Sequence, residues 1–106
     1  MQAGLTRTFQ ALADPTRRAI VQMLGERDMT AGEIGAQFEM SAPSVSHHLN
    51  VLKQADLIQS ERNGQTIVYS LNATVVQEFL AEVLQFFNVG TLDQIAKLQG
   101  GKSHDA

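Results

Sequence analysis

Cysteine is missing from this chain of 106 residues. Its absence excludes disulfide bonds, thiolate metal ligands and thiol-based redox sensing, and it fits a reducing compartment. Long apolar stretches are missing as well, since no run approaches the roughly 18–20 residues of a membrane-spanning helix. The first residues lack the apolar segment of a signal peptide. We therefore expect a cytoplasmic protein.

The sequence also lacks the residue sets on which most enzymes depend. It has no cysteine nucleophile, no glycine-rich phosphate loop and no inward-facing carboxylate pair beside a histidine. Two of the three histidines, His47 and His48, are adjacent, and adjacent side chains do not share a face of a helix. They therefore form a poor metal-binding pair, and we predict no catalytic activity, no metal site and no cofactor.

Positive charge is scarce. The formal net charge is −3 and the isoelectric point is about 5.5, which argues mildly against a nucleic-acid binder, because such domains are usually basic. The distribution weakens this objection, since residues 1–27 carry four arginines against two acidic residues, whereas residues 28–70 carry two basic residues against five acidic ones. DNA binding with few phosphate contacts stays open, with a shallow dependence of affinity on salt.

What the chain does contain suits one compact domain, because 106 residues are too few for two. We predict a domain over residues 1–90 and a C-terminal tail over residues 91–106 that is partly helical or disordered. A domain of this size has a modest core, so apolar surface beyond that core favours burial by a second copy.

Two helices are predicted in the first quarter of the chain. Apolar residues at helical spacing indicate the first helix, namely Leu5, Phe9 and Leu12. Asp14-Pro15 ends it, because the residue before a proline is biased away from helix and proline suits the first turn of the next one. The second helix runs from Thr16 to Leu24, and we expect Gly25 to terminate it.

A helix-turn-helix follows. Thr30 and Glu33 form a capping box, which predicts a short third helix that ends near Phe38. After a turn at Glu39-Met40, Ser41 is the expected N-cap of the next helix. Two short helices joined by a tight turn are the DNA-binding arrangement in which the second helix enters the major groove.

The helix over residues 41–55 has two different faces. Its apolar residues form one narrow stripe, made of Val45, Leu49 and Leu52. The opposite side is polar and nearly uncharged, so its partner is recognised by hydrogen-bond pattern rather than by charge. We predict that this helix contacts DNA through five side chains, those of Ser41, Ser44, Ser46, His47 and Asn50.

Two further residues, one in this helix and one at the start of the second helix, have competing interpretations. His48 lies on the edge of the apolar stripe, and we expect it to have a structural role, with a hydrogen bond to a neighbouring backbone group. Arg17 is expected to anchor the fold through Asp14 or a carboxylate of a neighbouring helix, and a DNA phosphate is the alternative partner.

Asn63-Gly64 lies between two extended runs and predicts a β-hairpin, because both turn positions need a positive φ. With these two residues as the turn, Arg62 faces Gln65. Four apolar residues then share the face that packs on the helices, namely Ile58, Ile67, Tyr69 and Leu71. The polar tip over residues 61–66 is the expected wing, and its predicted DNA contacts are Arg62, Asn63 and Gln65.

The last strong helix is predicted to begin at Asn72 or Thr74 and to end near Asn88. Its apolar residues cover about half of the cylinder, more than the ~100° stripe that one core contact needs. The surplus favours a second surface, so we predict a homodimer built from the first and last helices. The predicted interface consists of Leu5, Phe9, Val76, Phe79, Leu80, Val83 and Phe87.

Several segments, taken in order, resemble the ArsR family of bacterial winged-helix repressors. Phe9–Arg18 is similar to the opening of the family, Ser44–Leu57 resembles its recognition helix, and Arg62–Leu71 resembles its wing. The resemblance implies a winged helix-turn-helix fold that is mainly helical with a small β-hairpin. It also implies a homodimeric repressor on an imperfect palindrome, with the first and last helices at the dimer interface.

Many members of this family sense metals through ligands that this chain lacks. One site uses a Cys-x-Cys pair on the third helix, and another uses histidine and carboxylate ligands on the last helix, which here offers Glu78 and Glu82 but no histidine. The chain is therefore similar to the cysteine-free, autorepressor-type (SdpR-like) branch. Two alternatives stay open, a winged-helix dimer that acts mainly through protein partners and a metal-responsive repressor with a non-cysteine site.

Overall fold

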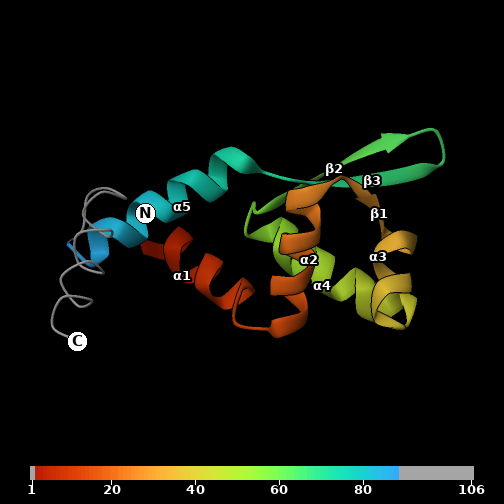
Figure 1. Cartoon of the computed structure of the whole chain (residues 1–106), viewed down its shortest axis with the longest axis horizontal. Coiled ribbons are helices and arrows are strands. Elements are labelled where there is room, and N and C mark those ends of the chain that lie inside the picture. The colour runs from red at the N-terminus through yellow and green to blue at the C-terminus, as the bar shows by residue number, and fades with distance from the viewer. Residues whose placement is uncertain (1, 89–106) are drawn as a thin grey trace, which may run out of the picture. The chain divides into compact units, whose positions relative to one another are not determined.

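The computed structural model describes residues 2–88, which contain five helices and three strands. The chain divides into two compact units, residues 1–76 and residues 77–106, which are described separately. The predicted tail over residues 91–106 lies outside the described residues. Figure 1 shows the elements, which are α1 (Gln2–Ala11), α2 (Pro15–Glu26), β1 (Met29–Thr30), α3 (Ala31–Phe38), α4 (Ala42–Gln54), β2 (Ile58–Asn63), β3 (Thr66–Leu71) and α5 (Ala73–Phe86).

The core of the first unit consists of apolar side chains from α1 to α4 and from the sheet. Its largest fully buried side chains are those of Ile20, Ile34, Leu49, Leu52, Leu57 and Ile58. The predicted inner stripe of α4 is confirmed, because Val45 is 4% exposed and Leu52 is completely buried. Burial of this stripe determines which side of α4 faces solvent.

Helices α3 and α4 begin directly after their predicted N-caps, Thr30 and Ser41, whereas α2 begins at Pro15, one residue before the predicted Thr16. Asp14 caps α2, where its carboxylate accepts a hydrogen bond of 3.0 Å from the backbone N–H of Arg17. The capping box of α3 is confirmed, with 3.1 Å from the Glu33 N–H to the Thr30 hydroxyl and 2.8 Å from the Thr30 N–H to the Glu33 carboxylate. Side-chain oxygens thus satisfy N–H groups that have no partner within the helix.

The predicted end of α2 at Gly25 is wrong. The helix continues through Gly25 to Glu26, and the chain leaves it at Arg27 in an extended conformation, with φ −164° and ψ 158°. The N–H of Arg27 donates a hydrogen bond of 3.2 Å to the carbonyl oxygen of Met23. Because this ending needs no residue with positive φ, the glycine signal does not mark it.

The sheet has three antiparallel strands in the order β1-β3-β2. The sequence analysis missed β1, in which Met29 pairs with Tyr69 and Thr30 pairs with Val68. Two residues are too few to display the alternation by which a strand is recognised in a sequence. The same Thr30 caps α3, so β1 joins the helix-turn-helix directly to the hairpin.

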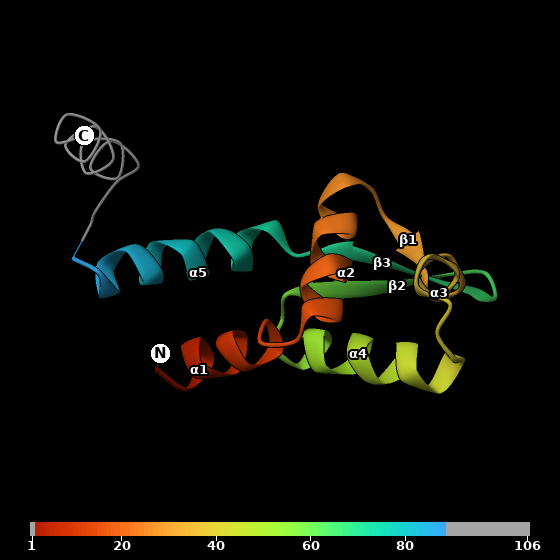
Figure 2. The same ribbon diagram turned by 60° about the horizontal axis from the view of Figure 1, so that its bottom comes forward.

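The predicted register of the hairpin is wrong by two residues. Asn63 pairs with Thr66 and Arg62 pairs with Ile67, so Gly64 and Gln65 form the turn. Only Gly64 has a positive φ, of 69°, which is what the first central residue of a type II′ turn requires. The shift carries Ile67 away from the core, and its side chain is 38% exposed. Figure 2 shows this end of the hairpin projecting past α2.

Helix α5 begins at Ala73, between the two predicted starts, and the side chain of Asn72 accepts a hydrogen bond of 3.3 Å from the N–H of Val75. It ends at Phe86, and Asn88 then adopts a left-handed conformation with φ 63°. None of its residues is fully buried. No helix in the described part of the chain is long and apolar enough to cross a membrane.

The capping box makes folding depend on pH through Glu33. The hydrogen bond from the Thr30 N–H lowers the pKa of the Glu33 carboxyl in the folded protein. A depressed carboxyl pKa stabilises the fold above the pKa of the unfolded chain, and this stabilisation is lost as the pH falls through the folded pKa. We predict that Glu33→Gln reduces the loss of stability between about pH 5 and pH 3. Urea unfolding across this pH range measures the free energy of unfolding of both proteins. The same pH dependence in Glu33→Gln and wild type would contradict the prediction.

Candidate nucleic-acid interface

The outer face of α4 carries the predicted polar side chains. Ser44, Ser46, His47 and Asn50 are all exposed; His47 and Asn50 lie opposite the buried stripe, and Ser44 and Ser46 lie on its two flanks. Ser41 is exposed too, but it also caps the helix. Its hydroxyl oxygen accepts a hydrogen bond of 3.4 Å from the Ser44 N–H and donates one of 3.0 Å to the Ser44 hydroxyl. The helix therefore presents one row of hydroxyl, imidazole and amide groups to solvent.

Close packing of α3 and α4 holds this row in place. A Cβ atom on Gly35 would lie 3.2 Å from Cγ2 of Val45, so a larger residue would require this methyl group to shift by a few tenths of an ångström. The turn between them contains Glu39 in a left-handed conformation, with φ 50° and ψ 43°. A shallow groove of about 350 Å³ runs along the helix pair, and the side chains that line it are uncharged. The first turns of α4 therefore border an open groove, which Ala42 and Ser46 help to line.

The wing presents its three predicted contact residues on an exposed tip. Arg62, Asn63 and Gln65 are all exposed. The register places Arg62 opposite Ile67 on one face of the hairpin and Asn63 opposite Thr66 on the other. Within residues 2–88, Arg62 forms no ion pair. Its guanidinium is therefore available for an anionic partner.

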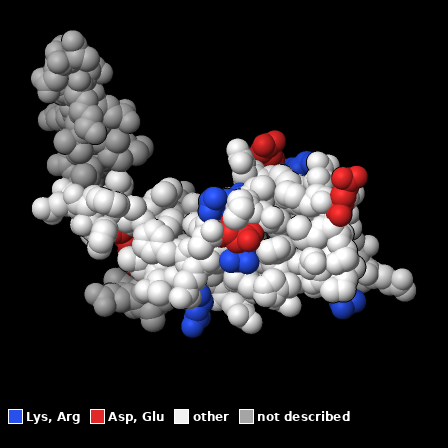
Figure 3. All heavy atoms as spheres, turned by 90° about the horizontal axis from the view of Figure 1, so that it is seen from below, with Lys and Arg blue, Asp and Glu red and all other residues white. Residues whose placement is uncertain are grey.

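Charge does not gather into a basic patch on the face that Figure 3 shows. Blue and red side chains are scattered over a surface that is mostly uncharged. One of the arginines near the N-terminus is bonded within the chain, since Arg18 donates a hydrogen bond of 2.7 Å to the carbonyl oxygen of Leu12. Such a surface favours recognition by hydrogen-bond pattern over attraction to phosphates.

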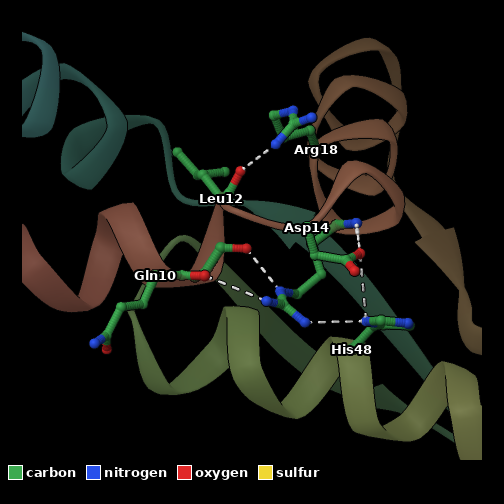
Figure 4. Close-up of polar contacts among 7 residues, drawn as sticks. Gln10, Leu12, Asp14, Arg18 and His48 are labelled. Carbon is green, nitrogen blue, oxygen red and sulfur yellow. Dashed lines mark hydrogen bonds and ion pairs between the residues drawn. The ribbon is translucent and has the colours of Figure 1, made fainter.

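Arg17 and His48 form a polar network at the corner between α1, α2 and α4 (Figure 4). The predicted structural role of His48 is confirmed, since its side chain is 15% exposed. Its partner is a side chain, however, because Nδ1 lies 3.3 Å from Nη1 of Arg17 rather than at a backbone group. The predicted role of Arg17 as an anchor of the fold is confirmed, but Asp14 binds its backbone N–H, and the side chain binds no carboxylate: Nε donates to the carbonyl oxygen of Ala11 at 2.6 Å.

Asp14 completes this network. Its Oδ2 atom lies 3.9 Å from Nδ1 of His48 and accepts the hydrogen bond from the Arg17 N–H. That hydrogen bond is the main reason why the pKa of the Asp14 carboxyl is lowered. Sequence reasoning missed the network because it joins residues that are 31 positions apart.

The predicted dimer residues are apolar side chains that the single chain leaves accessible. On α1, Phe9 is 48% exposed and Leu5 is half-buried. On α5, Leu80 is 53% and Phe87 is 67% exposed, whereas Val76, Phe79 and Val83 are half-buried. Across residues 2–88, no group of three or more histidine, aspartate or glutamate side chains is placed to hold a metal ion.

Comparison with known proteins gives consistent matches. A family model described as "Helix-turn-helix domain" matches residues 12–61. The transcriptional repressor SdpR of Bacillus subtilis (strain 168) is 51% identical over 89 residues, which are 84% of this chain and 99% of SdpR. The HTH-type transcriptional regulator Rv2034 of Mycobacterium tuberculosis is 40% identical over 81 residues, which are 76% of each chain.

A solved structure shows the same fold. The ArsR-like transcriptional regulator from Rhodococcus sp. RHA1 superposes with a TM-score of 0.73 at 26% identity, covering 96% of this chain and 92% of that one. Both the helical layers and the wing are therefore shared with a protein of similar size.

The wing turn allows a test of its backbone conformation. Gly64 has a positive φ, and a Cβ atom added there would meet nothing within 4 Å, so Gly64→Ala introduces backbone strain without a clash. We predict a loss of about 1 kcal/mol in the free energy of unfolding. Gly4→Ala is the matched control, because that position is equally open but helical, and alanine there should stabilise by up to about 1 kcal/mol. Chemical unfolding measures both, and equal effects would contradict the strain argument.

Proposed function

This chain belongs to the ArsR family of winged helix-turn-helix transcriptional regulators, and from that premise we propose that it is a dimeric repressor of a palindromic operator. As a family member it is a DNA-binding transcriptional regulator. It acts in the cytoplasm by occupying DNA, without catalysis. The observation that carries the proposal is the polar, uncharged outer face of α4 beside an exposed wing.

The outer face of α4 supplies the base contacts. Asparagine amides pair with adenine, while hydroxyl and imidazole groups donate to or accept from base edges in the major groove. Sequence discrimination therefore comes from Ser44, Ser46, His47 and Asn50. Ser41, at the N-terminal end of the helix, contacts the sugar-phosphate backbone of the DNA. On the wing, Arg62 contacts phosphate or the minor groove, with Asn63 and Gln65 beside it. Few cationic groups take part, so the affinity should depend only modestly on salt.

Apolar residues of α1 and α5 supply the dimer interface. Phe9 and Leu80 leave large apolar areas accessible on a single chain, and a second copy of the same chain would bury them. A two-fold axis then presents two copies of α4 to the same side of the duplex. The half-sites should therefore be centred about one helical turn apart, roughly 10–10.5 base pairs.

The contribution of His47 to DNA recognition is testable by truncation. We predict that His47→Ala lowers affinity for the operator by about tenfold, because a lost base contact costs ~1–3 kcal/mol. The fold should remain intact, since this side chain is exposed. Fluorescence anisotropy on an operator selected from a random duplex library measures the change. Gln22→Ala, at an exposed position of α2, is the control. Unchanged operator affinity in His47→Ala would contradict the assignment.

The dimer is testable by placing a charge in its interface. Leu80→Glu should yield a folded monomer at micromolar concentration, because a buried unpaired carboxylate opposes association. Sedimentation equilibrium measures the mass. Gln85→Glu adds the same charge to another, exposed position of α5 and should remain dimeric. A wild-type chain that sediments as a monomer, or a dimeric Leu80→Glu, would overturn the proposed interface.

A further inference from the structure

One arginine side chain joins three helices at a single corner. The Arg17 guanidinium belongs to α2 and donates to two carbonyl oxygens at the end of α1, from Nε to Ala11 at 2.6 Å and from Nη2 to Gln10 at 3.2 Å. Its third nitrogen, Nη1, lies 3.3 Å from Nδ1 of His48 on α4. The guanidinium is planar and rigid, so these contacts fix the directions of the three helices relative to one another.

His48 lies directly beside the outward-facing part of α4. It follows His47, and the two imidazole rings are 5.6 Å apart. A guanidinium can only donate hydrogen bonds, so in a hydrogen bond between these two groups Nδ1 of His48 is the acceptor. The contact is therefore directional and lies one residue away from a side chain proposed to contact a base.

Apolar packing alone would not hold α4 in one orientation. Burial of the stripe around Leu49 stabilises α4 against the core, but the hydrophobic effect has no directional preference. A hydrogen bond weakens steeply as its angle departs from linear. The contact between Arg17 and His48 thus restrains rotations of α4 that the apolar contacts would tolerate.

We propose that the Arg17–His48 contact positions the recognition helix relative to α1, and that it thereby sets the separation of the two recognition helices in the dimer. The inference rests on the proposed function, because α1 belongs to the proposed dimer interface and α4 to the proposed DNA interface. Arg17 and His48 are positioning residues that touch no base. Their effect is on which half-site spacing the dimer accepts.

Arg18 provides a matched control within the same turn. Its Nη1 atom donates to the carbonyl oxygen of Leu12 at 2.7 Å, so it also ties the start of α2 to the end of α1. Within residues 2–88, its hydrogen bond leads to this turn and not to α4. Arg17→Lys and Arg18→Lys are therefore the same chemical change, and only the first removes a contact to the recognition helix.

The experiment compares four variants of the full chain on three duplexes. Arg17→Lys keeps the charge but loses the planar fork, and His48→Leu removes the acceptor while keeping apolar bulk. His48→Asn restores an acceptor, its amide oxygen, near the position of Nδ1. Arg18→Lys is the control. The duplexes are the selected operator, the same operator with one base pair inserted between the half-sites, and a random sequence, all measured by fluorescence anisotropy at one salt concentration.

Wild type, His48→Asn and Arg18→Lys should prefer the original spacing to the same extent. Arg17→Lys and His48→Leu should bind the operator with about tenfold lower affinity than wild type, as expected for the loss of a hydrogen bond to a charged group. Their affinities for the other two duplexes should stay within about twofold of the wild-type values. Circular dichroism and sedimentation verify that each variant is a folded dimer. If His48→Leu does not fold, the affinities of Arg17→Lys for the three duplexes test the positioning role.

Two results would overturn the positioning role while leaving the proposed function intact. One is an unchanged spacing preference in both Arg17→Lys and His48→Leu. The other is a parallel loss of affinity on all three duplexes, which indicates a direct phosphate contact or general destabilisation. A wild-type protein that does not distinguish operator from random DNA would instead overturn the proposed function, and this inference with it.

Discussion

Burial of one apolar stripe on α4 is the constraint on which the other features depend. The helix has 13 residues, a length that is only marginally stable in water by itself. Leu49 and Leu52 are almost completely buried, and removing their surface from water stabilises the helix and decides which of its sides faces the core. The polar row is exposed because it lies opposite this stripe. Gly35 contributes to the same packing, since a Cβ atom there would lie only 3.2 Å from Cγ2 of Val45.

Several charged side chains of this protein bind backbone groups at the ends of helices. Asp14 and Glu33 cap helices, and Arg17 and Arg18 bind carbonyl oxygens at the end of α1. These bonds satisfy polar backbone groups at helix ends, which would otherwise be left without partners. With a formal net charge of −3, the chain has little positive charge in excess for phosphates. Under the proposed function, neutral donors and acceptors on α4 supply the discrimination among DNA sequences.

Predictions from the sequence succeeded where a signal and its consequence lie within a few residues. Thr30 and Glu33 are three residues apart, and the capping box forms as expected. The inner stripe of α4 follows from helical spacing alone. The hairpin was predicted in the correct place but with the turn at the wrong residues, because Asn63-Gly64 and Gly64-Gln65 both contain a glycine that can adopt a positive φ. A shift of two residues keeps every side chain on its own face, so the alternation of apolar residues does not distinguish the two registers.

The sequence by itself determined the helix-turn-helix, the outward residues of α4 and the presence of a wing, because hydrophobic periodicity, capping and turn chemistry act over short distances. Only the tertiary structure decided the register of the hairpin, the addition of β1 and the partners of Arg17. Each of these depends on groups brought together from distant parts of the chain, as Met29 is with Tyr69 and Arg17 is with His48. A donor such as guanidinium can satisfy several different acceptors, so its residue type does not specify which one it meets. The packing of α1, α2 and α4 determines which acceptors the Arg17 guanidinium meets.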